Sequence, residues 1–219
     1  PVYTAFFKSL GATVQTSNIQ QVYIYMENGT GYPDNPERFI FFSKAVVQIA
    51  GKLRRKPDVI HCHDWQTGLI PSLLQNTKGQ GSRASMPGTC LSIHNLAYQG
   101  VCDAGNYRLT NLPRNYFTSS AVEFYGQLNF MKAGLVFADQ LTTVSPQYAT
   151  EIMTPEFGEG LDGVVRQRVG DLSGILNGVD YTQWRTTGNP HLHFDYSAQD
   201  ISGKIRNKSA LLDEFGLAR

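Results

Sequence analysis

The chain has 219 residues, of which 41% are hydrophobic and 11% aromatic. This composition excludes a disordered or collagen-like chain, and the length suits one large domain, or one and a half domains of about 100–150 residues each. The 19 Lys and Arg residues balance 18 Asp and Glu residues and form no basic face that would bind nucleic acid. No apolar run approaches the roughly 20 residues that span a membrane, so we expect neither a nucleic-acid nor a membrane partner.

The chain termini and cysteines indicate the cellular context. Three cysteines without C-x-x-C spacing are typical of reduced core thiols in an intracellular protein. The sequence starts at Pro1, without an initiator Met or the features of a signal peptide. We therefore expect a piece of a longer chain.

Hydrophobic residues recur first with a strand period and then with a helix period. Residues 22–26 have the β-branched and aromatic character of a strand. A helix is predicted to start with Asn35 as its N-cap and Pro36 in its first turn. Its core face would be formed by side chains three or four positions apart: Phe39, Phe42, Val46, Ile49 and Leu53.

Beyond residue 57, short strands alternate with helices. The sequence predicts strands at 59–63, 89–93, 140–144 and 172–176, and helices at 69–74, 147–153 and 201–215. This alternation is typical of an α/β fold, and we expect a Rossmann-like parallel sheet with helices on both faces. Residues 181–197 are polar and unpatterned, which indicates a linker, and residues 77–88 are predicted to form a surface loop.

Polar and aromatic side chains follow each predicted strand. In a parallel sheet the carboxyl ends of the strands share one edge, where loops converge and helix N-termini point outward. The side chains expected at this edge are His61, His63, Asp64, Trp65, Gln66, His94, Asn95, Tyr98, Gln99, Ser145, Asn177 and Asp180. This mixture of hydrogen-bonding and aromatic groups suits a polyhydroxylated ligand.

Several of these positions also have a purely structural interpretation. Asp64 could cap the next helix, and we weigh this interpretation evenly against a ligand role. His94 with Asn95, and Asn177 with the following glycine, could simply turn the chain. Ser145 before a proline is more typical of a helix start than of a nucleophile, since no nucleophile elbow surrounds it.

A metal site is the main alternative to a site for a polyhydroxylated ligand. His61, His63 and Asp64 resemble part of a zinc cluster, and His94 would have to supply a further ligand. The spacing argues against this hypothesis, because Asp64 directly follows His63 on a strand expected to be covered on both faces. Phosphate-binding and dinucleotide-binding glycine motifs are missing from the sequence. We expect neither a metal nor a resident cofactor.

Blocks of the sequence resemble, in order, the signature of bacterial glycogen synthases and plant starch synthases. They are HCHDWQTGL at 61–69, HNLAYQG at 94–100, TVSPQYA at 143–149 and GILNGVD at 174–180. The resemblance implies a GT-B glycosyltransferase, in which a cleft separates two Rossmann-like domains. Such an enzyme transfers glucose from ADP-glucose to the non-reducing end of an α-1,4-glucan, with retention.

The resemblance also implies roles for individual residues. His94 matches a histidine whose side chain grips the donor glucose and whose main-chain carbonyl faces the anomeric carbon, and Asp64 matches an aspartate near the acceptor; both are predicted to be catalytic. The predicted substrate-binding residues are Asn177, Trp65, Tyr98, Gln99 and Asn95. The implied partners are ADP-glucose and an α-1,4-glucan: glycogen, starch or a malto-oligosaccharide.

Parts of the family pattern are absent from this sequence, namely the K-x-G-G-L loop and the nucleotide-binding domain. We expect residues 1–180 to be an incomplete N-terminal Rossmann-like domain. Residues 181–219 would be a linker and a helix that lead toward a missing C-terminal domain. Such a piece would be inactive alone, and its parent enzyme would belong to the bacterial cytoplasm or the plastid stroma. The alternative is a carbohydrate-binding fragment without catalysis.

Overall fold

The computed structural model describes residues 26–27, 30–79 and 86–218. Most of the strand predicted at 22–26, and the middle of the loop predicted at 77–88, lie outside these residues. Within them, Met26–Glu27 (β1) pairs with Thr30–Gly31 (β2) in an antiparallel ladder.

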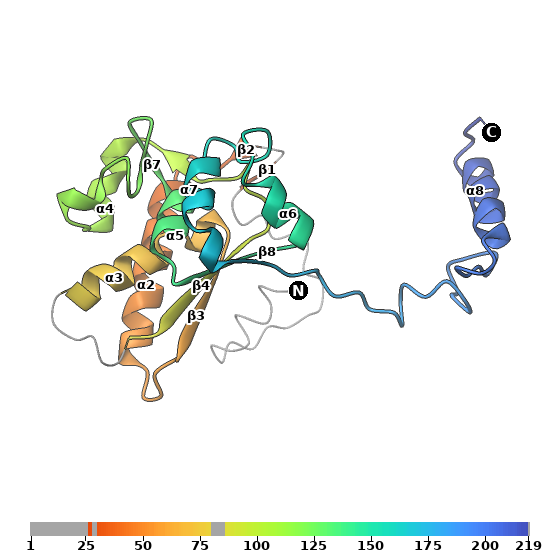
Figure 1. Ribbon diagram of the computed structural model, residues 1–219, viewed down its shortest axis with the longest axis horizontal. Coiled ribbons are helices and arrows are strands. Elements are labelled where there is room, and N and C mark those ends of the chain that lie inside the picture. Colours follow the sequence, from red (N-terminus) through yellow and green to blue (C-terminus); the bar gives the residue numbers. More distant parts are fainter. Residues whose placement is uncertain (1–25, 28–29, 80–85, 219) are drawn as a thin grey trace.

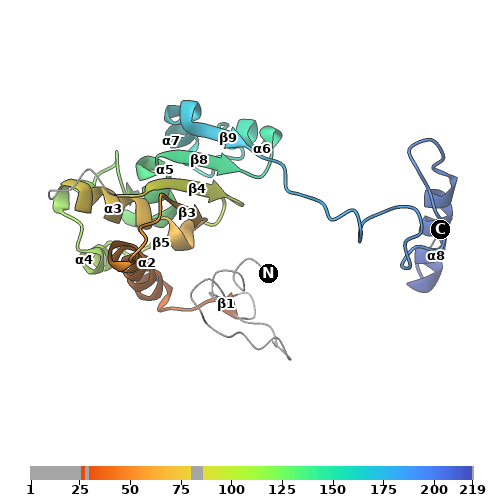
Figure 2. The ribbon, with the colours of Figure 1, turned by 90° about the horizontal axis from the view of Figure 1, so that it is seen from below.

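A parallel sheet forms the centre of the domain (Figure 2). Its strands, in spatial order, are Val59–His63 (β3), Gly88–Ile93 (β4), Gln140–Thr143 (β8) and Leu172–Gly174 (β9). Every neighbouring pair runs parallel. The α/β class and the parallel sheet predicted from the alternation of strands and helices are therefore confirmed, because each short β-branched or apolar run became one of these strands.

Helices precede, connect and follow the strands along the chain. They are Asn35–Lys52 (α2), Ile70–Gly79 (α3), Tyr107–Thr110 (α4), Phe130–Phe137 (α5), Pro146–Glu151 (α6), Asp162–Gln167 (α7) and Ser202–Glu214 (α8). Single 3-10 turns occupy Trp65–Thr67, Ala104–Asn106, Arg114–Tyr116 and Val169–Asp171. Figure 1 shows α2, α3 and α5 together on one side of β3 and β4. Right-handed crossovers between strands that are added in one direction place the connecting helices on one face.

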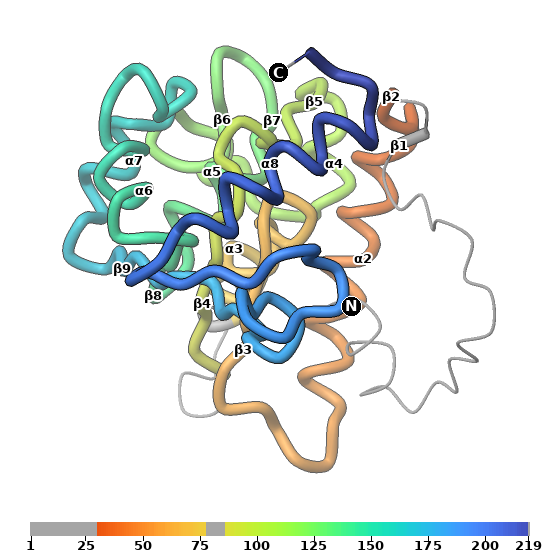
Figure 3. Tube along the Cα trace, turned by 90° about the vertical axis from the view of Figure 1, so that its right-hand side faces the viewer, coloured from red at the N-terminus to blue at the C-terminus, as the bar shows by residue number. Residues whose placement is uncertain are grey.

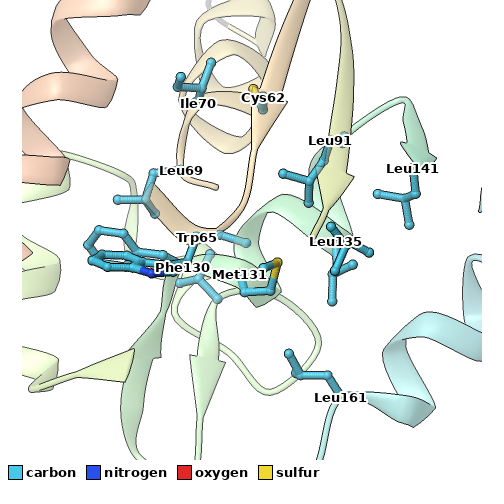
Figure 4. Packing of buried hydrophobic residues seen from close by; sticks show 14 of the residues in the cluster. Cys62, Trp65, Leu69, Ile70, Leu91, Phe130, Met131, Leu135, Leu141 and Leu161 are labelled. Carbon is cyan, nitrogen blue, oxygen red and sulfur yellow. The ribbon is translucent and has the colours of Figure 1, made fainter. Parts of the chain in front are cut away.

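The hydrophobic core lies between this face of the sheet and the helices (Figure 4). Its labelled side chains are Cys62, Trp65, Leu69, Ile70, Leu91, Phe130, Met131, Leu135, Leu141 and Leu161. Helix α5 approaches β4 closely, because a Cβ on Gly134 would lie 2.8 Å from Leu91 Cδ2 and 3.2 Å from the Cα of Gly68.

Burial raises the pKa of the Cys62 thiol to about 12, and all three cysteines are free.

Helix α2 differs from its prediction in two ways. Asp34, not Asn35, occupies the N-cap position, and its side chain makes no capping hydrogen bond. The buried face includes Phe39 and Ile40, whereas Ile49 is 46% exposed. The reason is that α2 packs against α3 and the 3-10 turn at Trp65, with Phe39 edge-on to the indole at 4.8 Å between ring centroids.

A small antiparallel sheet, which the sequence analysis missed, lies between β4 and α5. It contains Val101–Cys102 (β5), Glu123–Phe124 (β6) and Gln127–Asn129 (β7), in the order β5-β7-β6. Lys132 of α5 is buried and its Nζ donates to the carbonyl oxygens of Ser119 and Glu123, both at 2.6 Å. Burial lowers the pKa of Lys132. This cation therefore attaches the small sheet to α5.

Helix α8 stands apart from the sheet at the end of an extended segment (Figures 1 and 2). It passes in front of the sheet in Figure 3 because that view looks along the line that joins them. Part of the segment predicted as a linker packs on α8: Asn207 Nδ2 donates to the Phe194 carbonyl at 2.7 Å, and the Arg206 guanidinium lies 3.7 Å from the Phe194 ring centroid. The predicted end of α8 at Gly216 is confirmed by a φ of 61° there. No helix among the described residues is long and apolar enough to cross a membrane.

Candidate functional site

The loops after β3 and β4 meet at the carboxyl edge of the sheet, as predicted. Asp64 directly follows β3, and its Oδ1 accepts a hydrogen bond from the backbone N–H of His94 at 2.8 Å. Its own N–H donates to the Ser92 carbonyl at 3.0 Å. Asp64 stands at the N-cap position of the 3-10 turn but makes no side-chain cap. Its carboxylate therefore joins two loops rather than capping a helix.

The backbone of Asp64 is strained. Its φ of 54° and ψ of −170° fall in a region that is essentially restricted to glycine and costs about 1–3 kcal/mol. Such strain persists only where the surroundings hold it, and it concentrates at functional sites. Two hydrogen bonds help to hold it here, one to Ser92 in β4 and one to His94 in the loop after β4.

The loop at 94–100 is fixed at further backbone N–H groups. Leu96 N–H donates to the Tyr148 hydroxyl at 3.0 Å, and Ala97 N–H donates to Asn95 Oδ1 at 3.0 Å. At the end of the loop, Gly100 has a φ of 62°, and a Cβ there would lie 2.3 Å from the Trp65 ring. Only glycine fits both this backbone and the indole beside it.

Two hollows flank this loop. The first, of about 300 Å³, is lined by His94, Asn95, Ala97, Val144, Tyr148, Phe157 and Glu159. The second, of about 620 Å³, is lined mainly by the start of α2 and by Trp65, Ala97, Tyr98, Gln99, Gly100 and Phe130. Ala97 lines both, so the loop is a wall that the two hollows share.

The predicted site residues differ in how accessible they are. His94 and Asn95 are exposed at the first hollow, and Tyr98 is 54% exposed at the second. Trp65 and Gln99 are buried, and both lie in the wall of the second hollow. Their side chains therefore support the wall of this hollow and present little surface to a ligand.

Gln99 has hydrogen-bond partners at both ends of its amide. Its Nε2 donates to the Glu159 carbonyl at 2.9 Å, and its Oε1 accepts from Asn129 Nδ2 at 2.7 Å. Asn129 in turn caps α5 by accepting the Lys132 N–H. Gln99 therefore connects the loop at 94–100 to α5 and to the wall of the first hollow.

Asn177 is not joined to this group. It is exposed and lies three residues beyond the end of β9, which β8 separates from β4 in the sheet. With strands about 4.8 Å apart, that places its loop roughly 10 Å along the same edge. Ser145 caps α6 by accepting the Tyr148 N–H at 2.9 Å, so the interpretation of Ser145 as a helix start is confirmed.

Three imidazoles form a row at the ends of β3 and β4. The ring centroids of His61 and His63 are 4.2 Å apart, and those of His63 and His94 are 5.3 Å apart. His61 Nε2 lies 2.7 Å from Ser92 Oγ, which in turn lies 2.6 Å from Thr142 Oγ1. The described part of the chain contains no group of three or more His, Cys, Asp or Glu side chains arranged to hold a metal ion.

Sequence analysis missed three residues at the first hollow: Tyr148, Phe157 and Glu159. Phe157 is 44% exposed, and Glu159 has a φ of 50°. Tyr148 belongs to the TVSPQYA block and could have been found there. No periodicity or motif marks Phe157 or Glu159, because only the path of the loop at 154–160 brings them opposite His94.

Comparisons with known proteins identify the family of this chain. A family model described as the starch synthase catalytic domain matches residues 9–167. The glycogen synthase of Anaeromyxobacter sp. (strain Fw109-5) is 49% identical over 186 residues, which are 85% of this chain and 39% of the relative. The glycogen synthase of Opitutus terrae is 48% identical over 188 residues, again 85% of this chain and 39% of the relative.

A solved structure has the same fold. The catalytic domain of starch synthase IV from Arabidopsis thaliana, bound to ADP and acarbose, superposes with a TM-score of 0.66 at 32% sequence identity. The match covers 86% of this chain and 39% of that one, so the chain spans about two fifths of the length of these relatives. With the family model matching most of its length, this chain belongs to the starch synthase catalytic domain family.

Proposed function

We propose that this chain supplies the sugar-binding wall of a glucosyltransferase, an enzyme that transfers glucose from ADP-glucose to the non-reducing end of an α-1,4-glucan with retention. The observation that carries the proposal is the hydrogen bond from the His94 amide to Asp64, which fixes the loop beside an open hollow. Family membership supports the reaction class. The ADP and acarbose bound to the Arabidopsis domain support a nucleotide-linked donor and a glucan acceptor.

The chemistry proposed for His94 is electrostatic. Its main-chain carbonyl would face the anomeric carbon, where a fixed dipole stabilises the positive charge that develops as the nucleotide departs. Because Asp64 accepts the His94 N–H, we propose that Asp64 acts by holding this residue in place. Asn95, Tyr98 and Asn177 would bind sugar hydroxyls or rings, with Trp65 and Gln99 behind them.

The opposite wall of the cleft is proposed to lie in the part of the relatives that this chain does not match. Residues 1–180 would form the incomplete N-terminal domain, and residues 181–219 the linker and helix that lead to the nucleotide-binding domain. The chain alone would be inactive, because transfer requires the donor to be held between both halves. The parent enzyme would act in the bacterial cytoplasm or the plastid stroma.

The test joins the two halves. The chain would be fused to the part of the Anaeromyxobacter glycogen synthase that it does not match, and the fusion would be incubated with ADP-[14C]glucose and glycogen. We expect label in the polymer from the fusion, and none above background from the 219-residue chain or from a His94→Ala fusion. A soluble, folded fusion that incorporates no label would contradict the proposal.

A carbohydrate-binding fragment without catalysis is the second candidate. The exposed Tyr98 beside the larger hollow favours it, because aromatic rings can pack on sugar rings. Titration of the chain with maltoheptaose, followed by NMR, would shift resonances of Tyr98 and Asp64 under both candidates. Only the labelled-glucose assay on the fusion separates them.

A further inference from the structure

His63 links the imidazole row to the candidate site. Its Nδ1 lies 3.0 Å from His94 Nε2, and the two rings are stacked with an interplanar angle of 30°. The link joins the end of β3 to the loop after β4, as the Asp64 carboxylate does through the backbone. His94 is thus held at its amide by Asp64 and at its ring by His63.

A hydrogen bond between two imidazole nitrogens needs a proton on one and a lone pair on the other. Burial, with the imidazoles of His61 and His94, lowers the pKa of His63, and the Asp64 carboxylate opposes this only in part. His63 is therefore neutral near pH 7 and carries one ring proton. The direction of the bond is decided by which nitrogen holds that proton.

The two possible directions differ in what they leave unpaired. Among the described residues, His63 Nε2 has no hydrogen-bond partner, and the ring is half-buried. If His94 Nε2–H were the donor, the His63 proton would sit on Nε2 as a half-buried N–H without a partner. If His63 Nδ1–H is the donor, only a lone pair is left unpaired. Unpaired buried N–H groups are the rarer and more costly case.

We propose that His63 is a positioning residue, which donates Nδ1–H to His94 Nε2 and so holds the His94 ring in the tautomer protonated on Nδ1. His94 is exposed at the hollow of about 300 Å³, so Nδ1 is the ring nitrogen left for a ligand. The ring then presents a hydrogen-bond donor to an oxygen of the bound molecule. That this oxygen is a glucose hydroxyl rests on the proposed function; the tautomer itself does not.

The experiment observes the His94 ring directly. The 219-residue chain, labelled with 15N-histidine, is studied by long-range 1H–15N correlation at about pH 7.5, above the ordinary imidazole pKa. We expect His94 to be protonated on Nδ1 in the parent chain, and to lose this preference in His63→Phe, which keeps a ring but has no donor. The conservative His63→Asn, whose amide can donate from a position close to Nδ1, should restore it.

His61→Gln is the matched control. It removes the other imidazole that contacts His63 but leaves the His63–His94 pair intact, so the His94 tautomer should not change. A parent chain with His94 protonated on Nε2, or a folded His63→Phe that keeps the Nδ1 tautomer, would overturn the proposal. If His63→Phe fails to fold, the parent spectrum and His63→Asn still decide. Failure of the labelled-glucose assay would affect the proposed function and leave this result standing.

Discussion

Asp64 Oδ1 accepts a hydrogen bond from the backbone N–H of His94 at 2.8 Å, and the backbone of Asp64 has a φ of 54°. A non-glycine residue in this conformation costs about 1–3 kcal/mol, which its surroundings must offset. The carboxylate binds an amide at the start of the neighbouring loop. Backbone strain and a contact between two loops thus occur in the same residue.

The first prediction separates these two contributions at Asp64. Asp64→Ala should lower the free energy of unfolding by about 1–2 kcal/mol, because it loses a hydrogen bond to a charged group and keeps the strain. Asp64→Gly should be more stable than Asp64→Ala by about 1 kcal/mol, because glycine relieves the positive φ. Urea unfolding measures both, with the exposed Asp58→Ala as the control. Equal stabilities of the alanine and glycine variants would refute this account of the strain.

The second prediction concerns the contact between Gly100 and Trp65. Gly100→Ala places a Cβ 2.3 Å from the indole at a residue with a φ of 62°. It should cost about 2 kcal/mol or more, because strain and overpacking add. Gly126→Ala is the matched control, since Gly126 has a φ of 81° with open space around it and should cost only about 1 kcal/mol. Chemical denaturation of both variants gives the comparison. Similar losses in the free energy of unfolding would show that the Trp65 ring shifts to accommodate the added Cβ.

The third prediction tests whether Gln99 is a structural wall. Gln99→Leu leaves Asn129 Nδ2 buried without its acceptor, which should cost about 1–3 kcal/mol in the free energy of unfolding. Gln127→Leu, at an exposed position of the strand that contains Asn129, should cost little. Thermal and urea unfolding provide the measurement. A Gln99→Leu chain as stable as the parent would contradict a structural role for these hydrogen bonds.

The fourth prediction is a pH dependence that originates at His63. Its pKa in the folded chain lies below the ordinary 6.5, chiefly because of burial. The unfolded chain therefore binds the proton first, so the free energy of unfolding should fall as the pH drops below about 6.5, until the folded ring also protonates. His61, Asp64 and His94 all face this ring. Unfolding curves between about pH 5 and pH 8 should show a weaker slope in His63→Phe, and identical slopes would argue against His63 as the origin.

The sequence predicts the sheet well because each strand is a short apolar or β-branched run followed by polar residues. It predicts the buried face of α2 less well. Helical periodicity cannot distinguish between adjacent faces, and α2 packs on α3 and Trp65, which leaves Ile49 exposed. The sequence does not predict the small antiparallel sheet, because strands of two or three residues, such as Val101–Cys102, are too short to show an alternation of apolar and polar residues.

The contact between Asp64 and His94 follows from topology, since adjacent parallel strands end at the same edge. The roles of the remaining site residues depend on contacts that are distant in the sequence. Gln99 could be assigned to the wall only once Asn129 and Glu159 were seen on either side of it. Phe157 reaches the first hollow through a loop that has no regular structure to predict.

Ala97 belongs to both hollows, and this shared position has an energetic consequence. A ligand that displaces the wall from one side alters the free energy of binding on the other side. Thermodynamic linkage requires the second ligand to act back on the first by the same factor. Two ligands, one in each hollow, would then be coupled through the backbone at Ala97 without contacting each other.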